Sequence, residues 1–220
     1  MSRATFHRAP EAERRQELIE ATLDCIAEAG LEGATVRQIA LRAGVTAGLL
    51  RHYFESKEEM VAEAYRSVVA TFAAKAVDME GTPGRQLRDF ITLNLTAPVA
   101  NNRTLSIWAA FIGKVRVDAT LAAIHRQGYL DFRDDLQGLI ANFLRSRGRT
   151  VVEVDCRRLA IAINGMIDGL WLEACLAHEL FTNSELATVA VSTVESLLGL
   201  EFEPIDEAAA QERGQNRAEQ

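Results

Sequence analysis

The chain has 220 residues, of which 48% are hydrophobic and only four are proline, and its formal net charge is -7. This length permits one or two domains with a sizeable core, and this composition is typical of a mostly helical globular protein. No apolar run approaches the roughly 18 to 20 residues that a membrane-spanning helix needs. The basic N-terminus also lacks the apolar segment of a secretory signal, so we expect a cytoplasmic protein without a membrane partner.

The first part of the chain predicts one long helix followed by two short ones. Apolar residues at helical spacing predict a helix over residues 10–29, which Gly30 ends. Thr35, with Gln38 three residues later, forms a capping box that predicts a short second helix. Thr46 is a suitable N-cap for a third helix, directly after a glycine-containing turn.

A longer helix and a break in the chain follow. Ser56 and Glu59 form a second capping box, which predicts a helix reaching about Val77. The sequence MEGTPG at 79–84 is the sharpest break in the middle of the chain. We therefore expect an N-terminal domain over 10–78 and a larger C-terminal domain over 79–200, with the fourth helix bridging both.

Everything beyond the break again predicts helices, near 85–96, 103–117, 118–147, 154–177 and 184–200. Only the sequence RTVVEV at 149–154 has a brief strand-like pattern. Residues 201–220 carry six acidic residues and two arginines, which favours an acidic disordered tail. The predicted fold is all-α, with about nine helices.

The two short helices and their tight turn have the pattern of a helix-turn-helix. Although the chain is acidic, residues 35–57 carry four basic residues against one acid. In such a motif the second helix enters the major groove of DNA, where arginine can make a bidentate contact to guanine. Helix N-termini also favour phosphate. The residues expected to contact DNA are Thr35, Arg37, Thr46, Ala47, Gly48, Leu49, Arg51, His52, Tyr53 and Lys57.

Residues 14–72 resemble the DNA-binding domain of the TetR family of bacterial transcriptional repressors. The matching stretch is TVRQIALRAGVTAGLLRHYFESKEEMV, which contains the family's frame IA…AGV…F…K. It departs from the family at Arg51 and His52, where two aromatic residues are usual. The order His-Tyr-Phe, the sequence LIEATLDCIAEAGLEGATVRQIA and the sequence DGLWLEACL at 168–176 are similar to the choline-responsive repressors of glycine-betaine synthesis genes.

The resemblance implies that the C-terminal helices form an effector pocket and a dimer interface. The partners it implies are a palindromic double-stranded DNA operator, a small-molecule effector and a second copy of the chain. Aromatic residues on three predicted helices, together with one carboxylate, would suit a quaternary ammonium ion. The candidate ligand-binding residues are Trp108, Phe111, Tyr129, Phe132, Asn164, Asp168 and Trp171. The alternative that these rings are ordinary core residues stays open.

Other classes of function are open but less well supported. A repressor of the same fold could sense an apolar metabolite or drug instead of a cation. A helical-bundle enzyme would need inward-facing paired carboxylates or Glu-x-x-His motifs, and neither His125 nor His178 has a glutamate three residues before it. The four scattered histidines form no HxxxH pair and no glycine-rich phosphate loop is present, so we expect no metal site, no cofactor and no enzymatic activity. His125 in particular is expected at the surface or in a satisfied core position.

Overall fold

The computed structural model describes residues 10–73, 79–97, 99–182 and 184–203, and within these ranges the fold is helical without a strand. The strand-like sequence at 149–154 forms no strand, and a helix begins inside it. The predicted helices are present with ends shifted by a few residues. They are α1 (Glu11–Gly33), α2 (Val36–Arg42), α3 (Ala47–Tyr53), α4 (Lys57–Ala73), α5 (Pro83–Asn94), α6 (Asn102–Ile112), α7 (Ala119–Ser146), α8 (Glu153–Ala177) and α9 (Glu185–Leu198), with a 3-10 turn at His178–Leu180.

Local side-chain hydrogen bonds set the ends of the two short helices, as predicted. The Thr35 hydroxyl accepts a hydrogen bond from the Gln38 backbone N–H (3.3 Å), and the Gln38 side-chain oxygen accepts one from the Thr35 N–H (3.2 Å). Thr46 caps α3 by accepting from the Leu49 N–H (3.2 Å). Between the two helices Gly44 has a φ of +64°, a left-handed conformation that glycine adopts without steric cost.

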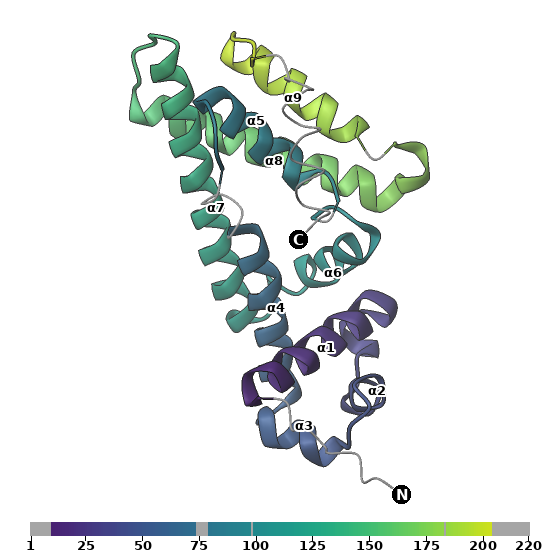
Figure 1. The fold of residues 1–220 in the computed structure, drawn as a ribbon. Helices are drawn as coiled ribbons and strands as arrows, with labels where there is room; N and C mark the ends of the chain where they lie inside the picture. Colours follow the sequence, from purple (N-terminus) through teal and green to yellow (C-terminus); the bar gives the residue numbers. More distant parts are fainter. Residues whose placement is uncertain (1–9, 74–78, 98, 183, 204–220) are drawn as a thin grey trace, which may run out of the picture.

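Helices α1 to α4 enclose the first of two apolar cores. Leu18, Ile26, Ile39, Leu50 and Phe54 are each 3% exposed or less. Figure 1 shows α1, α2 and α3 grouped at one end of the molecule, with α4 leading away toward the other helices. The short helices α2 and α3 therefore depend on this shared core for their stability, since isolated helices of seven residues are unstable in water.

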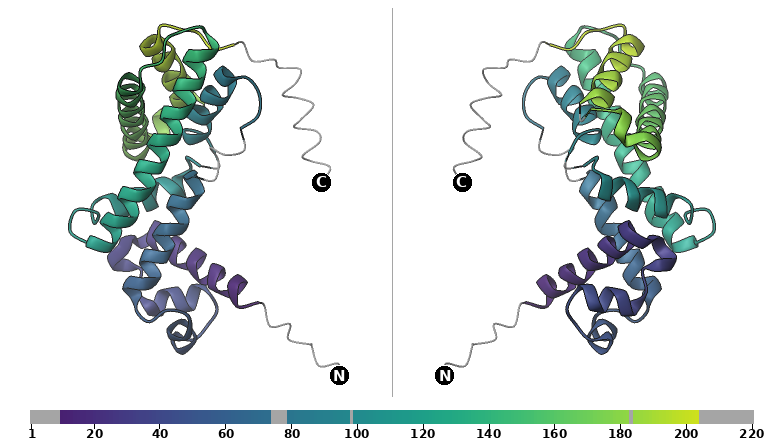
Figure 2. Two further views of the ribbon diagram at one scale, coloured as in Figure 1. Left: turned by 90° about the vertical axis from the view of Figure 1, so that its left-hand side faces the viewer. Right: turned by 90° about the vertical axis from the view of Figure 1, so that its right-hand side faces the viewer.

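Helix α4 connects this core to the rest of the molecule. Its first turn is capped by Ser56, whose hydroxyl accepts from the Glu59 N–H (3.0 Å). The Glu59 carboxylate returns to the Glu55 N–H (2.6 Å) instead of the Ser56 N–H, so the predicted capping box is displaced by one residue. From there α4 runs alongside the long helix α7 (Figure 2). Its predicted end near Val77 lies outside the described residues.

The second core lies among α5, α7, α8 and α9. Its fully buried members include Leu87, Phe90, Leu136, Ile140 and Ile163. Helix α6 belongs to both cores, since Ile107 and Phe111 pack with the first and Leu105 with the second. The domain limits 10–78 and 79–200 stay a prediction, and the break at 79–84 leads directly into α5, which Thr82 caps.

The start of the predicted acidic tail is part of the folded protein, which corrects our placement of its beginning at Glu201. Phe202 is 7% exposed and its ring packs on Phe143, with ring centroids 5.1 Å apart. The Glu203 carboxylate accepts hydrogen bonds from Thr82 (3.1 Å) and Arg147 (3.0 Å). The apolar ring and the paired carboxylate hold these residues to the second core, and the rest of the predicted tail, 204–220, lies outside the described residues.

Helix α8 buries one side in the second core, and its opposite, exposed side also carries apolar residues. Ile163 and Ile167 pack into the second core, whereas Ile161, Leu172 and Leu176 are exposed. By length and composition alone, α8 is apolar enough to cross a membrane, which our sequence analysis did not anticipate. A single helix of this kind is weak evidence for a membrane span, because a buried core helix can have the same composition.

Candidate functional site

Helix α3 anchors itself with two side chains and presents the rest of its surface. Leu50 is 2% exposed and Phe54, directly after the helix, is 3% exposed. Gly48, Arg51 and His52 are exposed, so the basic pair lies on the outer side of the helix. The remaining predicted contacts of this helix, which are Ala47, Leu49 and Tyr53, are half-buried. A short helix with an inward apolar side and an outward basic side has the geometry of a DNA recognition helix.

The other predicted DNA contacts flank this helix. Thr35, Arg37 and Thr46 are exposed. The two threonine hydroxyls already accept capping hydrogen bonds, and the Thr35 hydroxyl also donates to the Gln38 side-chain oxygen (3.0 Å). Further hydrogen bonding therefore falls to the Thr46 hydroxyl proton and to the free N–H groups at the start of each helix. Lys57 differs from this group, because its ammonium donates to the Leu31 carbonyl (3.0 Å) and is half-buried. This contact gives Lys57 a structural role that the sequence did not indicate: it ties the start of α4 to the end of α1.

A cavity of about 100 Å³ lies where α4, α6, α7 and α8 meet, with the end of α5 at its wall. A single water molecule needs about 10 to 15 Å³ on the same measure, so the cavity accommodates a small molecule of several non-hydrogen atoms. Six of the seven predicted ligand-binding residues line it, namely Trp108, Tyr129, Phe132, Asn164, Asp168 and Trp171. The lining residues that the sequence analysis missed are Tyr65, Val69, Asn94, His125, Gly128 and Ile167.

Phe111 is the predicted ligand residue that does not line the cavity. It is fully buried in the first core, where its ring stacks on Tyr65 with centroids 4.2 Å apart. Trp108, three residues earlier on α6, lies at the cavity wall. The physical reason is that α6 lies between two cores, so residues less than one turn apart pack with different neighbours. Phe111 supports Tyr65, which is itself a lining residue.

Asp168 places a carboxyl group within the aromatic wall. Burial raises the pKa of this carboxyl from its ordinary value of 3.8 to about 6. Its Oδ2 accepts a hydrogen bond from the Asn164 amide (3.2 Å), one turn earlier on α8. This bond stabilises the ionised carboxylate only in part, because burial without a cationic partner disfavours charge. A positively charged guest would supply the missing partner.

Two aromatic residues of the wall are fixed by their own contacts. The Trp171 indole Nε1 donates to the Asn94 carbonyl (2.8 Å), which holds the ring across the end of α5. The rings of Trp171 and Trp108 meet edge to face, with centroids 6.0 Å apart. Such contacts fix ring orientation before any ligand binds, and a pre-ordered site loses less conformational entropy on binding.

His125 and Tyr65 form the polar side of the wall. The Tyr65 hydroxyl and His125 Nδ1 lie 2.7 Å apart and share a hydrogen bond between α4 and α7. Burial lowers the pKa of His125 and raises the pKa of Tyr65 to about 12, so both groups are neutral near pH 7. The His125 ring also stacks on Tyr129, with centroids 5.7 Å apart. His125 therefore occupies a satisfied, partly buried position, one of the two that the sequence predicts, and it also lines the cavity.

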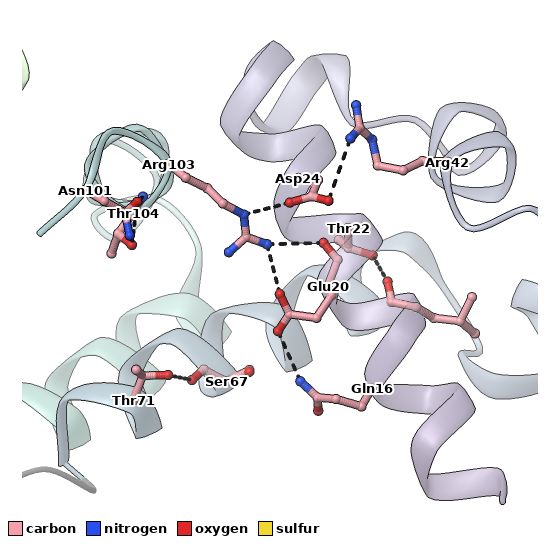
Figure 3. Close-up of polar contacts among 11 residues, drawn as sticks. Gln16, Glu20, Thr22, Asp24, Arg42, Ser67, Thr71, Asn101, Arg103 and Thr104 are labelled. Atoms are coloured by element: carbon pink, nitrogen blue, oxygen red, sulfur yellow. Dashed lines mark hydrogen bonds and ion pairs between the residues drawn. The ribbon is translucent and has the colours of Figure 1, made fainter. Parts of the chain in front are cut away.

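An ion-pair network links α6 to the helix-turn-helix. Arg103 Nε donates to Asp24 Oδ1 (2.6 Å) and its Nη2 to Glu20 Oε2 (2.9 Å), both on α1. On the other side of Asp24 lies Arg42, at the end of α2 (3.7 Å) (Figure 3). Exposed ion pairs contribute little to stability. They do join α1 and α2 to α6, the helix that carries Trp108 at the cavity wall.

Two protein-family profiles match the chain. The profile of bacterial regulatory proteins of the TetR family matches residues 18–64, and the profile "BetI-type transcriptional repressor, C-terminal" matches residues 83–199. Among known relatives, the HTH-type transcriptional regulator BetI of Pectobacterium carotovorum subsp. carotovorum (strain PC1) is 30% identical over 190 residues, which cover 84% of this chain and 94% of the relative. The BetI regulator of Yersinia pestis (strain Pestoides F) is 29% identical over 197 residues, covering 86% and 94%.

Solved structures agree with this assignment. A transcriptional regulator from Pseudomonas aeruginosa PAO1 superposes with a TM-score of 0.76 at 30% identity, covering 89% of this chain and 95% of the other. A regulator from Saccharomonospora viridis in complex with choline has a TM-score of 0.74, covering 84% and 97%, and at 18% identity it shows the fold alone. The chain therefore belongs to the BetI-type branch of the TetR family, whose members are DNA-binding transcriptional regulators and not enzymes.

Proposed function

We propose that this protein is a repressor that leaves its operator when a small quaternary ammonium ion, of which choline is the first candidate, occupies the cavity. The observation that carries the proposal is the partly buried carboxyl of Asp168 within a wall of aromatic rings. Rings attract a cation through their faces, by about 0.5 to 2 kcal/mol each depending on desolvation. The carboxylate adds a direct charge partner, which an uncharged guest cannot use.

The relatives support the same class of ligand. The profile over residues 83–199 is named for BetI, and one structural neighbour was solved with choline bound. A neighbour at 20% identity, FadR of Bacillus subtilis, was solved with stearoyl-CoA. A cavity of about 100 Å³ is too small for a long acyl chain. Size and charge together favour a compact cation over the apolar metabolite that we kept as an alternative.

We also propose that the working form is a cytoplasmic homodimer on a palindromic operator. One recognition helix contacts too few base pairs for useful specificity, and a two-fold pair of helices about 34 to 36 Å apart matches successive major grooves. The exposed apolar side chains of the last two helices favour pairing of α8 and α9 with those of a second copy; they are Ile161, Leu172, Leu176, Val189 and Leu197. Sedimentation of the purified protein as a monomer at micromolar concentration would contradict this arrangement.

A thermal-shift screen tests the effector class. The purified protein is heated with choline, with glycine betaine, and with 3,3-dimethylbutanol, the uncharged carbon isostere of choline. A ligand at 100 times its dissociation constant adds about 2.7 kcal/mol to the unfolding free energy. We expect a clear shift with choline and a much smaller one with the isostere. Equal shifts with both would show that charge is not recognised and would refute the role of Asp168.

A further inference from the structure

Helices α4 and α7 approach each other closely at the wall of the cavity. Gly128 on α7 faces Val69 on α4, and a Cβ atom added to Gly128 would lie 2.0 Å from Val69 Cγ1 and 3.4 Å from Val69 Cβ. Both residues line the cavity. Valine in a helix has one strongly preferred side-chain rotamer, so its methyl group cannot simply turn away. Any side chain at position 128 must therefore push the two helices apart.

We call the line of contact between α4 and α7 the seam, and a second contact lies one turn away along it. Tyr65 on α4 and His125 on α7 share the hydrogen bond described above, so each contact joins one residue of α4 to one of α7. Residues three or four positions apart lie on the same face of a helix, which places both contacts between the facing sides. Tyr65 is also buried in the core that holds the helix-turn-helix. The seam thus connects the cavity to α4, whose buried residues share the core of the helix-turn-helix.

We propose that Val69, packed on Gly128, is a specificity-determining residue of the repressor. Its side chain sets how large an effector head group the cavity admits, and displacement of Val69 by the effector moves α4. A guest that fills the space beside Val69 presses on α4 and changes the position of the helix-turn-helix. A guest that leaves this space empty binds without switching. The part that concerns ligand size rests on the proposed effector class, whereas the part that concerns the α4–α7 contact does not.

The first experiment uses no effector. An operator is selected from a random duplex DNA pool with the wild-type protein, and its affinity is measured for three variants. Gly128→Ala should imitate an occupied cavity and weaken operator binding by about tenfold or more, within the 5 to 150-fold range of allosteric couplings. Val69→Ala/Gly128→Ala should recover most of the affinity, because the two Cβ atoms are then 3.4 Å apart, an ordinary contact. The control is Gly138→Ala, also on α7, where an added Cβ meets nothing within 4 Å.

Two results of this experiment would overturn the proposal. A folded Gly128→Ala variant that binds the operator as tightly as Gly138→Ala would show that the seam does not control DNA binding. A double variant that stays as impaired as Gly128→Ala, whether folded or not by circular dichroism, would show that the contact with Val69 is not the cause.

The second experiment tests size selection with choline and triethylcholine as probes. Choline should release the wild-type protein from the selected operator. For each protein, the concentration of triethylcholine that releases the operator is divided by the concentration of choline that does so. This ratio should be at least about tenfold lower for Val69→Ala than for wild type, again within the range of measured couplings. An unchanged preference would remove Val69 from specificity. If wild type ignores both ions, the proposed effector class fails, and the operator affinities of the Gly128 variants still decide the role of the seam.

Discussion

Replacing Asp168 by asparagine removes a partly buried carboxyl group while keeping its shape and the hydrogen bond from Asn164. Burial raises the pKa of this carboxyl to about 6 in the folded protein, against an ordinary value of 3.8. The folded state therefore holds the proton more tightly than the unfolded state does. The contribution of Asp168 to stability is then greatest at acidic pH and is lost as the pH rises from about 4 to about 6.

The size of the effect follows from the pKa difference. A shift of about two units corresponds to about 3 kcal/mol, at 1.36 kcal/mol per unit. The carboxyl of the unfolded chain is already largely ionised at pH 4.5. About 1 kcal/mol of the roughly 3 kcal/mol of stability is therefore already lost when the pH has risen to 4.5. We expect the advantage of Asp168→Asn over wild type in unfolding free energy to grow by about 2 kcal/mol between pH 4.5 and pH 8.

Urea unfolding followed by circular dichroism, at a series of pH values, measures this difference. All other titrating groups are common to both proteins, so they cancel in the comparison. Asp134→Asn, which removes an exposed carboxylate from α7, is the control for the loss of one negative charge. If the difference between Asp168→Asn and wild type is the same at both pH values, Asp168 ionises as it would in water. The buried-carboxyl account of the cavity is then wrong.

Three further substitutions test other parts of the account. Arg51→Ala should weaken operator binding and relax the preference at one base pair by about 1 to 3 kcal/mol, measured by anisotropy on single-base operator variants; equal loss on every variant would place Arg51 on a phosphate. Tyr129→Leu should weaken choline binding by about 0.5 to 2 kcal/mol in calorimetry, and undiminished affinity would exclude its ring from the cation site. Arg103→Gln should change the unfolding free energy by no more than about 1 kcal/mol, yet it should raise the choline concentration that releases the operator. An unchanged release curve would show that the ion pairs do not transmit cavity occupation to the helix-turn-helix.

The helix-turn-helix could be predicted from sequence because local residues determine it. The caps at Thr35 and Thr46 and the turn at Gly44 each depend on residues within a few positions of one another. The anchors Leu50 and Phe54 follow from helical spacing. Lys57 shows the limit of such local reasoning, since its partner is the Leu31 carbonyl, 26 residues earlier in the chain.

The cavity could be predicted only in outline. Its aromatic residues stand out by type and spacing, but which side of a helix faces which core depends on tertiary packing. The aromatic pattern on three predicted helices includes both Phe111 and Trp108, yet α6 divides these two rings between different cores. Tyr65 was missed for the opposite reason, because it belongs to a helix that the sequence assigns to DNA binding. His125 has no sequence partner nearby, and only the fold brings it to Tyr65.

Titration of the protein–operator complex with choline, followed by fluorescence anisotropy at constant salt, tests the central claim most directly. We predict that the anisotropy of the labelled operator falls to that of free DNA as choline fills the cavity, and that Asp168→Asn stays bound over the same range. Anisotropy that stays high while calorimetry shows choline bound to the wild-type protein would contradict the account, because occupation of the cavity would then not control DNA binding.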